Sequence, residues 1–108
     1  MDAEEYQRLA LRTEAPGREQ RERLLNAALG LCGEAGEFAD SVKKAEFHAH
    51  PRDAAELKKE LGDVLWYVAL ACDALGLQMG DVMAENIAKL RRRYPEGFSS
   101  ERSLRRTE

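Results

Sequence analysis

Two pairs of acidic residues have the side-chain types and the spacing that a binding or catalytic site would need. Glu34 and Glu37 are three residues apart, and so are Glu60 and Asp63. In a helix, residues at this spacing lie on one face, so each pair presents two carboxylates side by side. A single pair of this kind is usually a solvated surface feature, and the pattern predicts a site only if the two pairs meet.

Four helical segments can position these pairs, with glycine and proline residues marking their ends. We expect helices at about 2–11, 18–47, 53–75 and 81–93. Asp53, with Glu56 three residues later, is typical of a capping box that opens the third segment, and Asp81 is expected to cap the fourth. The last dozen residues are expected to be frayed or adaptable.

The short turn at 48–52 makes the second and third segments antiparallel neighbours. Each of these helices carries a stripe of apolar residues along one face, and on both helices the acidic pair lies beside the stripe on the same side. Antiparallel packing of the two stripes brings these two sides together. The midpoint of positions 34 and 63 equals that of 37 and 60 and falls in the turn. We therefore expect Glu34 to face Asp63, and Glu37 to face Glu60.

Four carboxylates at one place would repel one another strongly and would need a cation. Oxygen ligands alone suit a hard cation, and a site that keeps positions open for water and phosphate suits Mg²⁺, with Mn²⁺ as a substitute. Neither helix has the Glu-x-x-His spacing of di-iron sites. The residues therefore predict a magnesium site formed by Glu34, Glu37, Glu60 and Asp63.

The long helices also carry apolar stripes, and the segment VLWYVALA at 64–71 is apolar nearly all the way round. A helix tolerates this only where it is covered on several sides, and one chain of this size is too small to do so. We predict an all-α fold, an antiparallel helical hairpin with flanking helices, whose four-helix-bundle core is completed by oligomerisation. Trp66 points away from the side of its helix that carries the acidic pair and is assigned to the core or to an interface.

Asn86, Lys89 and Arg93 share one face of the fourth helix. They either bind phosphate oxygens beside the metal or form a solvated basic end that complements the helix dipole. Tyr67 lies one turn after Asp63 and either lines a substrate pocket or buries its ring.

Composition and charge argue against a nucleic-acid-binding or membrane protein. The net charge of -3 gives no overall attraction to nucleic acid or to an anionic membrane, and no apolar run approaches the ~20 residues of a membrane span. The N-terminus lacks the basic start of a signal peptide, so we expect a cytoplasmic protein without nucleic-acid or membrane partners. One domain should span 1–108, with its core at about 18–94 and a C-terminal tail at 95–108. Cys32 and Cys72 are expected to be reduced core thiols.

Three segments carry a resemblance to a known family. They are GLCGEAGEFAD at 30–40, KKELGDVLWY at 58–67 and ENIAKLRRRYPEGF at 85–98. In this order and spacing they resemble the MazG-like, all-alpha nucleoside triphosphate pyrophosphohydrolase superfamily over about 29–98. Lys59 and Gly33 depart from the resemblance, because many members carry a further acid at these places.

The resemblance implies an enzyme that hydrolyses a nucleoside triphosphate between its alpha and beta phosphates, giving a monophosphate and pyrophosphate, in nucleotide-pool house-cleaning. It implies Mg²⁺ on the four carboxylates, with Glu34 or Glu37 orienting or deprotonating the attacking water. It also implies that the Asn86, Lys89 and Arg93 side chains hold the phosphates and sugar, in a homodimer or homotetramer.

Two other functions are compatible with the same residues. An enzyme like phosphoribosyl-ATP pyrophosphohydrolase would use similar acids on a different substrate. A non-catalytic helical oligomer that binds nucleotide or a protein partner would leave the acids solvated and would show no metal dependence. No residue pattern in the sequence indicates which base is recognised.

Overall fold

A computed structural model describes residues 1–51 and 53–106, and within them it is all helical. The helices are α1 (Ala3–Leu11), α2 (Gln20–Phe47), α3 (Ala54–Ala74), α4 (Met79–Arg93) and α5 (Ser100–Leu104). The predicted all-α class is confirmed, since no strand forms in the described part of the chain. None of the helices formed by these residues is long and apolar enough to cross a membrane.

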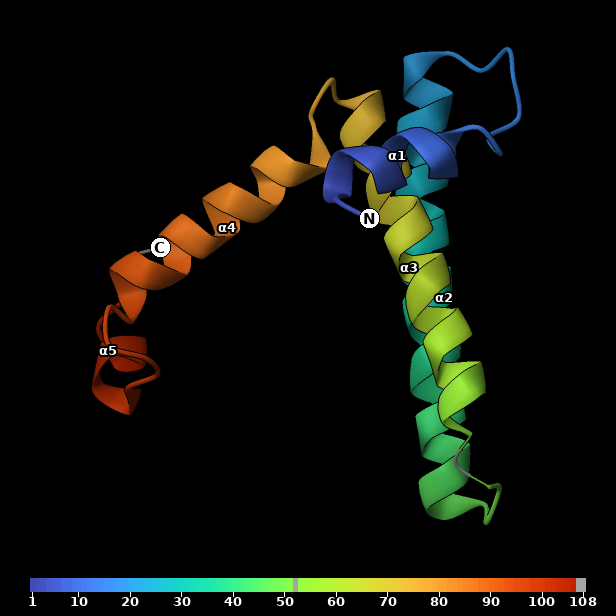
Figure 1. Cartoon of the computed structure of the whole chain (residues 1–108). Helices are drawn as coiled ribbons and strands as arrows, with labels where there is room; N and C mark the ends of the chain where they lie inside the picture. Colours follow the sequence, from blue (N-terminus) through green and yellow to red (C-terminus); the bar gives the residue numbers. More distant parts are fainter. Residues whose placement is uncertain (52, 107–108) are drawn as a thin grey trace.

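The centre of the fold is the hairpin of α2 and α3, which lie side by side along their length (Figure 1). Ala49, in the turn between them, adopts a left-handed backbone conformation with φ of 57°. Asp53 caps α3 as predicted, since its carboxylate accepts a hydrogen bond from the Ala55 amide at 2.9 Å. Glu56, the expected partner in a capping box, instead forms an ion pair with Lys59 at 3.2 Å.

Helix α1 and the loop after it are fastened across the open end of this hairpin. The Trp66 indole N–H of α3 donates to the Ala10 carbonyl at 3.0 Å and lies 2.9 Å from Thr13 Oγ1. Arg23 of α2 binds the Glu14 carboxylate through two hydrogen bonds, at 2.7 and 2.9 Å. These contacts hold residues 10–14 against both long helices.

The start of α4 is fixed by a side chain from α1. Gly76, with φ of 72°, ends α3, and the chain turns into α4 at Met79. The buried Gln7 side chain donates to the Leu77 carbonyl at 3.0 Å and accepts from the Met79 amide at 2.7 Å. The prediction that Asp81 caps this helix is wrong, because Gln7 already satisfies an amide of the first turn and the helix begins two residues earlier.

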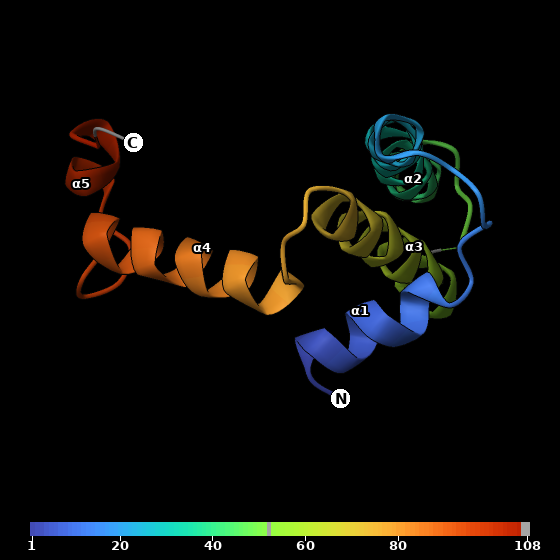
Figure 2. The same ribbon diagram turned by 90° about the horizontal axis from the view of Figure 1, so that it is seen from above.

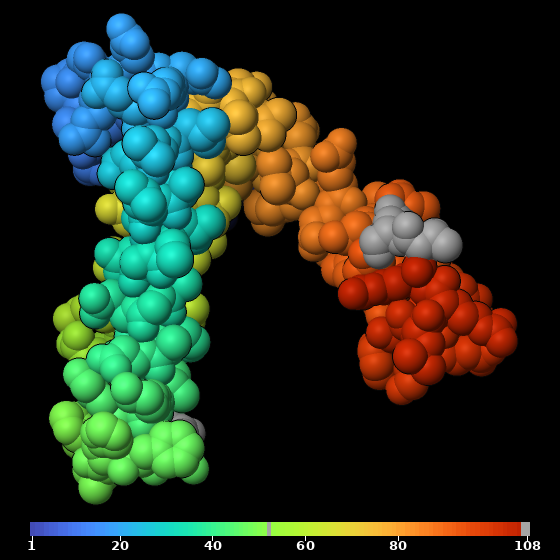
Figure 3. All heavy atoms as spheres, turned by 180° about the vertical axis from the view of Figure 1, so that it is seen from behind, coloured from blue at the N-terminus to red at the C-terminus, as the bar shows by residue number. Residues whose placement is uncertain are grey.

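Beyond this junction α4 leaves the hairpin and forms a separate arm (Figure 1), as the view from above also shows (Figure 2). The radius of gyration is 17.0 Å, whereas a compact domain of this length has a value of about 13 Å. The space-filling view shows two legs that diverge from their junction, with α5 at the far end of one leg (Figure 3). A single chain is therefore an open, two-legged particle.

This open shape leaves a small core and much exposed apolar surface. The fully or nearly buried hydrophobic residues are Ala27, Ala69, Leu70, Cys72, Ala74 and Met79. Large apolar side chains on the hairpin and on α4 are between about a third and two thirds exposed, among them Leu25, Leu29, Leu61, Leu65, Met83 and Ile87. Cys72 is buried as expected, but Cys32 is exposed, because it lies on a face of α2 that no described part of the chain covers.

The C-terminal segment is more ordered than the sequence indicated. The Ser99 hydroxyl accepts a hydrogen bond from the Arg102 amide at 3.3 Å and so caps α5. The Tyr94 and Phe98 rings lie 5.4 Å apart across the turn that precedes α5. The expectation of a frayed tail is therefore wrong for residues 100–104, since a cap and a ring contact hold this turn of helix against the end of α4.

We predict that Gln7→Ala lowers the free energy of unfolding by about 1–3 kcal/mol, because it leaves a part-buried carbonyl and a buried amide without their partners. Urea unfolding followed by circular dichroism measures this change. The matched control is Gln78→Ala, an exposed glutamine beside the same junction whose side chain caps nothing. Equal effects of the two substitutions would contradict the role given to Gln7.

Candidate metal centre

The hairpin brings three acidic side chains together. Glu34 of α2 and Glu60 and Asp63 of α3 each offer a carboxylate oxygen, and these oxygens lie within 4.8 Å of one another. Glu34 and Glu60 are half-buried, and Asp63 is exposed. Because the three oxygens converge on one point from two helices, a single cation placed there could contact all of them.

The electrostatics of Glu34 reflect this crowding. Its pKa is raised above the ordinary value, first by partial loss of solvent and then by the negative charges of Asp63, Glu60 and Glu37. A hydrogen bond with Glu60 adds to the effect, because it favours the protonated form of Glu34. The cluster thus carries more negative charge than it can easily hold, and a bound cation would relieve it.

Glu37, the fourth predicted ligand, lies outside this group of three. It is exposed, one turn further along α2, and it is close enough for its charge to act on Glu34. The structure therefore places Glu34 close to both Glu60 and Asp63 of α3.

A hollow of about 330 Å³ adjoins the acids and is lined by Glu34, Asp63, Trp66 and Tyr67. The prediction that Trp66 lies away from the acids is wrong, although its half-buried indole does pack where α3 meets α1 and the loop after it. The helical count gives only the direction of the Cα–Cβ bond, whereas the indole is wide and is turned by its hydrogen bond to α1. Its ring meets Tyr67 edge-on, with centroids 5.0 Å apart.

Tyr67 lies at the contact between α3 and α2. Its ring lines the hollow beside Asp63, and it also packs so closely on α2 that a Cβ atom at Gly30 would overlap it. The glycine thus lets the edge of the aromatic ring approach the neighbouring helix closely. This wall of the hollow is positioned by contact of the Tyr67 ring with α2 at Gly30.

Tyr6 of α1 is a residue near the site that sequence reasoning missed. Its pKa is raised, mainly by burial and also by the negative charge of Asp63. The ring packs against the core formed by Ala69, Cys72 and Met79. The sequence held no signal for this placement, because it depends on how α1 crosses α3.

The three polar residues predicted on α4 do not join the acids within one chain. Asn86 and Lys89 line a hollow of about 440 Å³ on α4, together with Arg92. Arg93 instead lines a different hollow, between α4 and α5. Both hollows belong to the leg that diverges from the hairpin (Figure 3). Within one chain, these three residues therefore lie apart from the acids.

The chemistry of the donor set fits a hard divalent cation. Its ligand atoms are carboxylate oxygens, which Mg²⁺, Mn²⁺ and Ca²⁺ prefer over nitrogen and sulfur. Three converging carboxylates leave other coordination positions for water and for phosphate oxygens. The acidic cluster could therefore hold a metal ion that also contacts a phosphorylated ligand.

We predict that Gly30→Ala destabilises the protein by about 1–3 kcal/mol, because the added methyl group displaces the Tyr67 ring and overpacks the seam. Gly33→Ala, one turn further along the same helix, meets open space. It should stabilise the protein by about 0.5–1 kcal/mol, since alanine is the better helix former. Thermal unfolding of the two variants checks this, and a neutral Gly30→Ala would contradict the packing.

Comparison with known proteins shows the family to which the chain with this acidic hairpin belongs. Residues 22–98 match the MazG nucleotide pyrophosphohydrolase domain. The chain is similar to the Gene 37 protein of Mycobacterium phage L5, with 39% identity over 82 residues that cover 70% of each chain. No solved structure matches the chain at a significant level. Because the domain match takes in α2, α3 and α4 and covers well over half of the sequence, the chain belongs to the MazG nucleotide pyrophosphohydrolase family.

Proposed function

We propose that the chain is a Mg²⁺-dependent nucleoside triphosphate pyrophosphohydrolase that removes nucleotides from the pool. It cleaves the bond between the alpha and beta phosphates, and water supplies the oxygen that completes the nucleoside monophosphate while pyrophosphate leaves. The observation that carries the proposal is the convergence of three carboxylates within 4.8 Å on a hairpin of this family. Oxygen donors in this number are suited to a metal that also binds phosphates.

In this proposal Glu34, Glu60 and Asp63 bind Mg²⁺, and Glu37 extends the site by one turn of α2. When bound, the ion supplies charge neutralisation on the phosphates and lowers the pKa of the attacking water. Glu34 or Glu37 orients that water and accepts its proton.

The nucleoside would occupy the hollow beside the acids. Tyr67 and Trp66 give it an aromatic wall, and Tyr6 lies close to Asp63 at the α1 side. Aromatic rings of this kind offer flat apolar surface to a base together with a polar group at the edge. Tyr67 is the substrate-contacting residue of this wall.

A second copy of the chain would complete the site. Asn86, Lys89 and Arg93 are suited to hold phosphates and sugar, but α4 carries them away from the acids of its own chain. The exposed apolar residues of the hairpin and of α4 are of the kind that association buries, and the basic end of α4 complements the acidic hairpin in charge. We therefore propose a homodimer or homotetramer in which α4 of one copy lies against the hairpin of another.

A panel of canonical and modified nucleoside triphosphates, incubated with Mg²⁺ and resolved by chromatography, tests the function. We expect a monophosphate plus pyrophosphate from at least one substrate. A diphosphate plus orthophosphate would show that the bond is assigned wrongly. No product from any substrate would favour a non-catalytic binding protein.

Glu60→Gln should reduce turnover in the same assay at least about a hundredfold, a loss typical of removing charge stabilisation from an active site. The matched control is Glu56→Gln, one turn earlier on α3, where the exposed carboxylate forms an ion pair with Lys59. This control should keep nearly full turnover. Similar losses in both variants would indicate a general effect of acidic charge on α3 instead of a metal site.

A further inference from the structure

The indole N–H of Trp66 is held by two acceptors at the end of α1 and in the loop after it. It donates to the Ala10 carbonyl at 3.0 Å and to Thr13 Oγ1 at 2.9 Å. The Thr13 hydroxyl in turn donates to the same Ala10 carbonyl at 2.7 Å. These hydrogen bonds form a closed triangle that fixes the orientation of the indole. Because the N–H is the only polar group of the side chain, the ring has no donor left for a ligand.

The loop that holds Trp66 is itself fixed to both long helices. The Glu14 carboxylate in this loop accepts two hydrogen bonds from Arg23 of α2, at 2.7 and 2.9 Å. The same guanidinium group donates to Asp73 of α3 at 2.5 Å. The side chains of Glu14 and Arg23 are only 13% and 20% exposed, so solvent weakens their ion pair little. The acceptors of the indole therefore keep their place relative to α2 and α3.

Stability alone gives a weak reason for the hydrogen bond between Trp66 and Thr13. The bond lies at an exposed position, where water can replace either partner, so its net contribution to stability is small. The Ala10 carbonyl has the Thr13 hydroxyl as a partner even without the indole. The clearer consequence concerns direction, because the ring is turned so that it lines the hollow beside Glu34 and Asp63.

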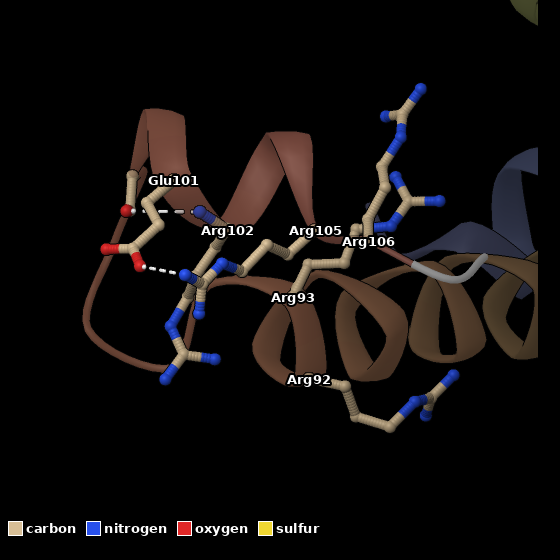
Figure 4. A pocket seen from close by; sticks show the side chains of 7 residues that line it. Arg92, Arg93, Glu101, Arg102, Arg105 and Arg106 are labelled. Atoms are coloured by element: carbon tan, nitrogen blue, oxygen red, sulfur yellow. Dashed lines mark hydrogen bonds and ion pairs between the residues drawn. The ribbon is translucent and has the colours of Figure 1, made fainter.

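This hollow combines carboxylate and aromatic side chains. Glu34 and Asp63 belong to the acidic cluster, and Trp66 and Tyr67 complete the lining. The two rings meet at 83°, so they offer apolar surface in two directions. A nucleotide has the same division, between charged phosphates and a flat base. By contrast, the described lining of the hollow between α4 and α5 (Figure 4) consists of charged side chains and Ser99 and includes no aromatic ring.

We propose that Trp66 is a further substrate-contacting residue, which stacks on the base of the nucleotide, and that Thr13 is the positioning residue that holds it there. This inference rests on the proposed function, because it places the nucleoside beside the acids. Since the indole donor is already used, Trp66 contacts the base through its ring surface alone. Every base offers such a surface, and that of a purine is larger than that of a pyrimidine. Trp66 therefore accepts different bases and favours purines.

Trp66 is the only tryptophan of the chain, so its fluorescence reports on the site directly. The test is a stopped-flow titration of the full chain with ATP, GTP, CTP and UTP in Mg²⁺, with the emission recorded before turnover. We expect quenching by nucleotides, with tighter binding of ATP and GTP than of CTP and UTP. Inorganic tripolyphosphate, which has the phosphates without a base, should leave the emission unchanged.

Three results of this titration overturn the proposal. The first is an emission that none of the four nucleotides changes. The second is an equal change with tripolyphosphate, which would mean that phosphate binding alone alters the surroundings of Trp66. The third is tighter binding of the pyrimidine nucleotides, since stacking on the ring surface favours the larger base.

Trp66→Leu should raise the KM for the best purine substrate at least about fivefold, because the stacking surface is lost. The kcat should change by less than about twofold, since stacking holds the substrate and the transition state equally. The matched control is Phe47→Leu, which removes a ring that is 77% exposed at the end of α2. It should leave KM unchanged. A parent-like KM in Trp66→Leu, or an equal rise in the control, overturns the proposal.

Thr13 variants test the positioning role without removal of the indole. Thr13→Val has nearly the same volume but no hydroxyl, and it should bind ATP about two- to tenfold more weakly in the fluorescence titration. Thr13→Ser keeps the hydroxyl and should bind ATP like the parent. Because Thr13 is exposed, neither change disturbs the core. Parent-like binding by Thr13→Val, or equal weakening in Thr13→Ser, would contradict the positioning role.

The fluorescence titration also separates this inference from the proposed function. Quenching by nucleotides without any hydrolysis product would remove the enzymatic function and leave the contact between Trp66 and the base. Hydrolysis by a parent protein whose emission does not respond to nucleotides would leave the enzymatic function and remove this contact.

Discussion

Glu34, Glu60 and Asp63 repel one another across the seam between α2 and α3, and the fold holds them within 4.8 Å in spite of that repulsion. Carboxylates on one flexible segment would move apart, but these three sit on two long helices whose register is set by a short turn. The pKa of Glu34 is raised by partial loss of solvent and, after that, by the negative charges of Asp63, Glu60 and Glu37. A fold that keeps such a cluster together favours the binding of a cation, because the binding energy of the ion offsets the repulsion among the carboxylates.

The other parts of the fold support the contact between α2 and α3 in different ways. Helix α1 closes the open end of the hairpin through the Trp66 indole and brings Tyr6 near Asp63. Gly30 lets the Tyr67 ring pack against α2 at the wall of the hollow. Gln7 sets the point where α4 departs, by bonding to both sides of the junction between α3 and α4. The departure of α4 leaves apolar surface exposed on both legs, which is why we propose that a second copy completes the site.

Much of this arrangement could be predicted from local signals. The helix ends near Asp53, Gly76 and Arg93, the hairpin, and the approach of Glu34 to Asp63 all follow from helical periodicity and a short turn. The errors arose where a distant contact decides the outcome. Gln7 displaces the expected cap at Asp81, and a hydrogen bond to α1 turns Trp66 toward the acids. The position of Tyr6 near the acids could not be predicted, because the residue pattern of α1 does not indicate how this helix packs against α3. The position of Asn86 and Lys89 away from the acids depends on the direction of α4, which no local signal encodes.

The most direct test of the central claim is a crystal structure of the protein grown with Mn²⁺, in which anomalous scattering locates the ion without assumptions about its ligands. The account predicts an anomalous peak about 2.0–2.3 Å from carboxylate oxygens of Glu34, Glu60 and Asp63, as expected for a hard divalent cation on oxygen. A structure in which these side chains point apart into solvent, with no ion between them, would contradict it.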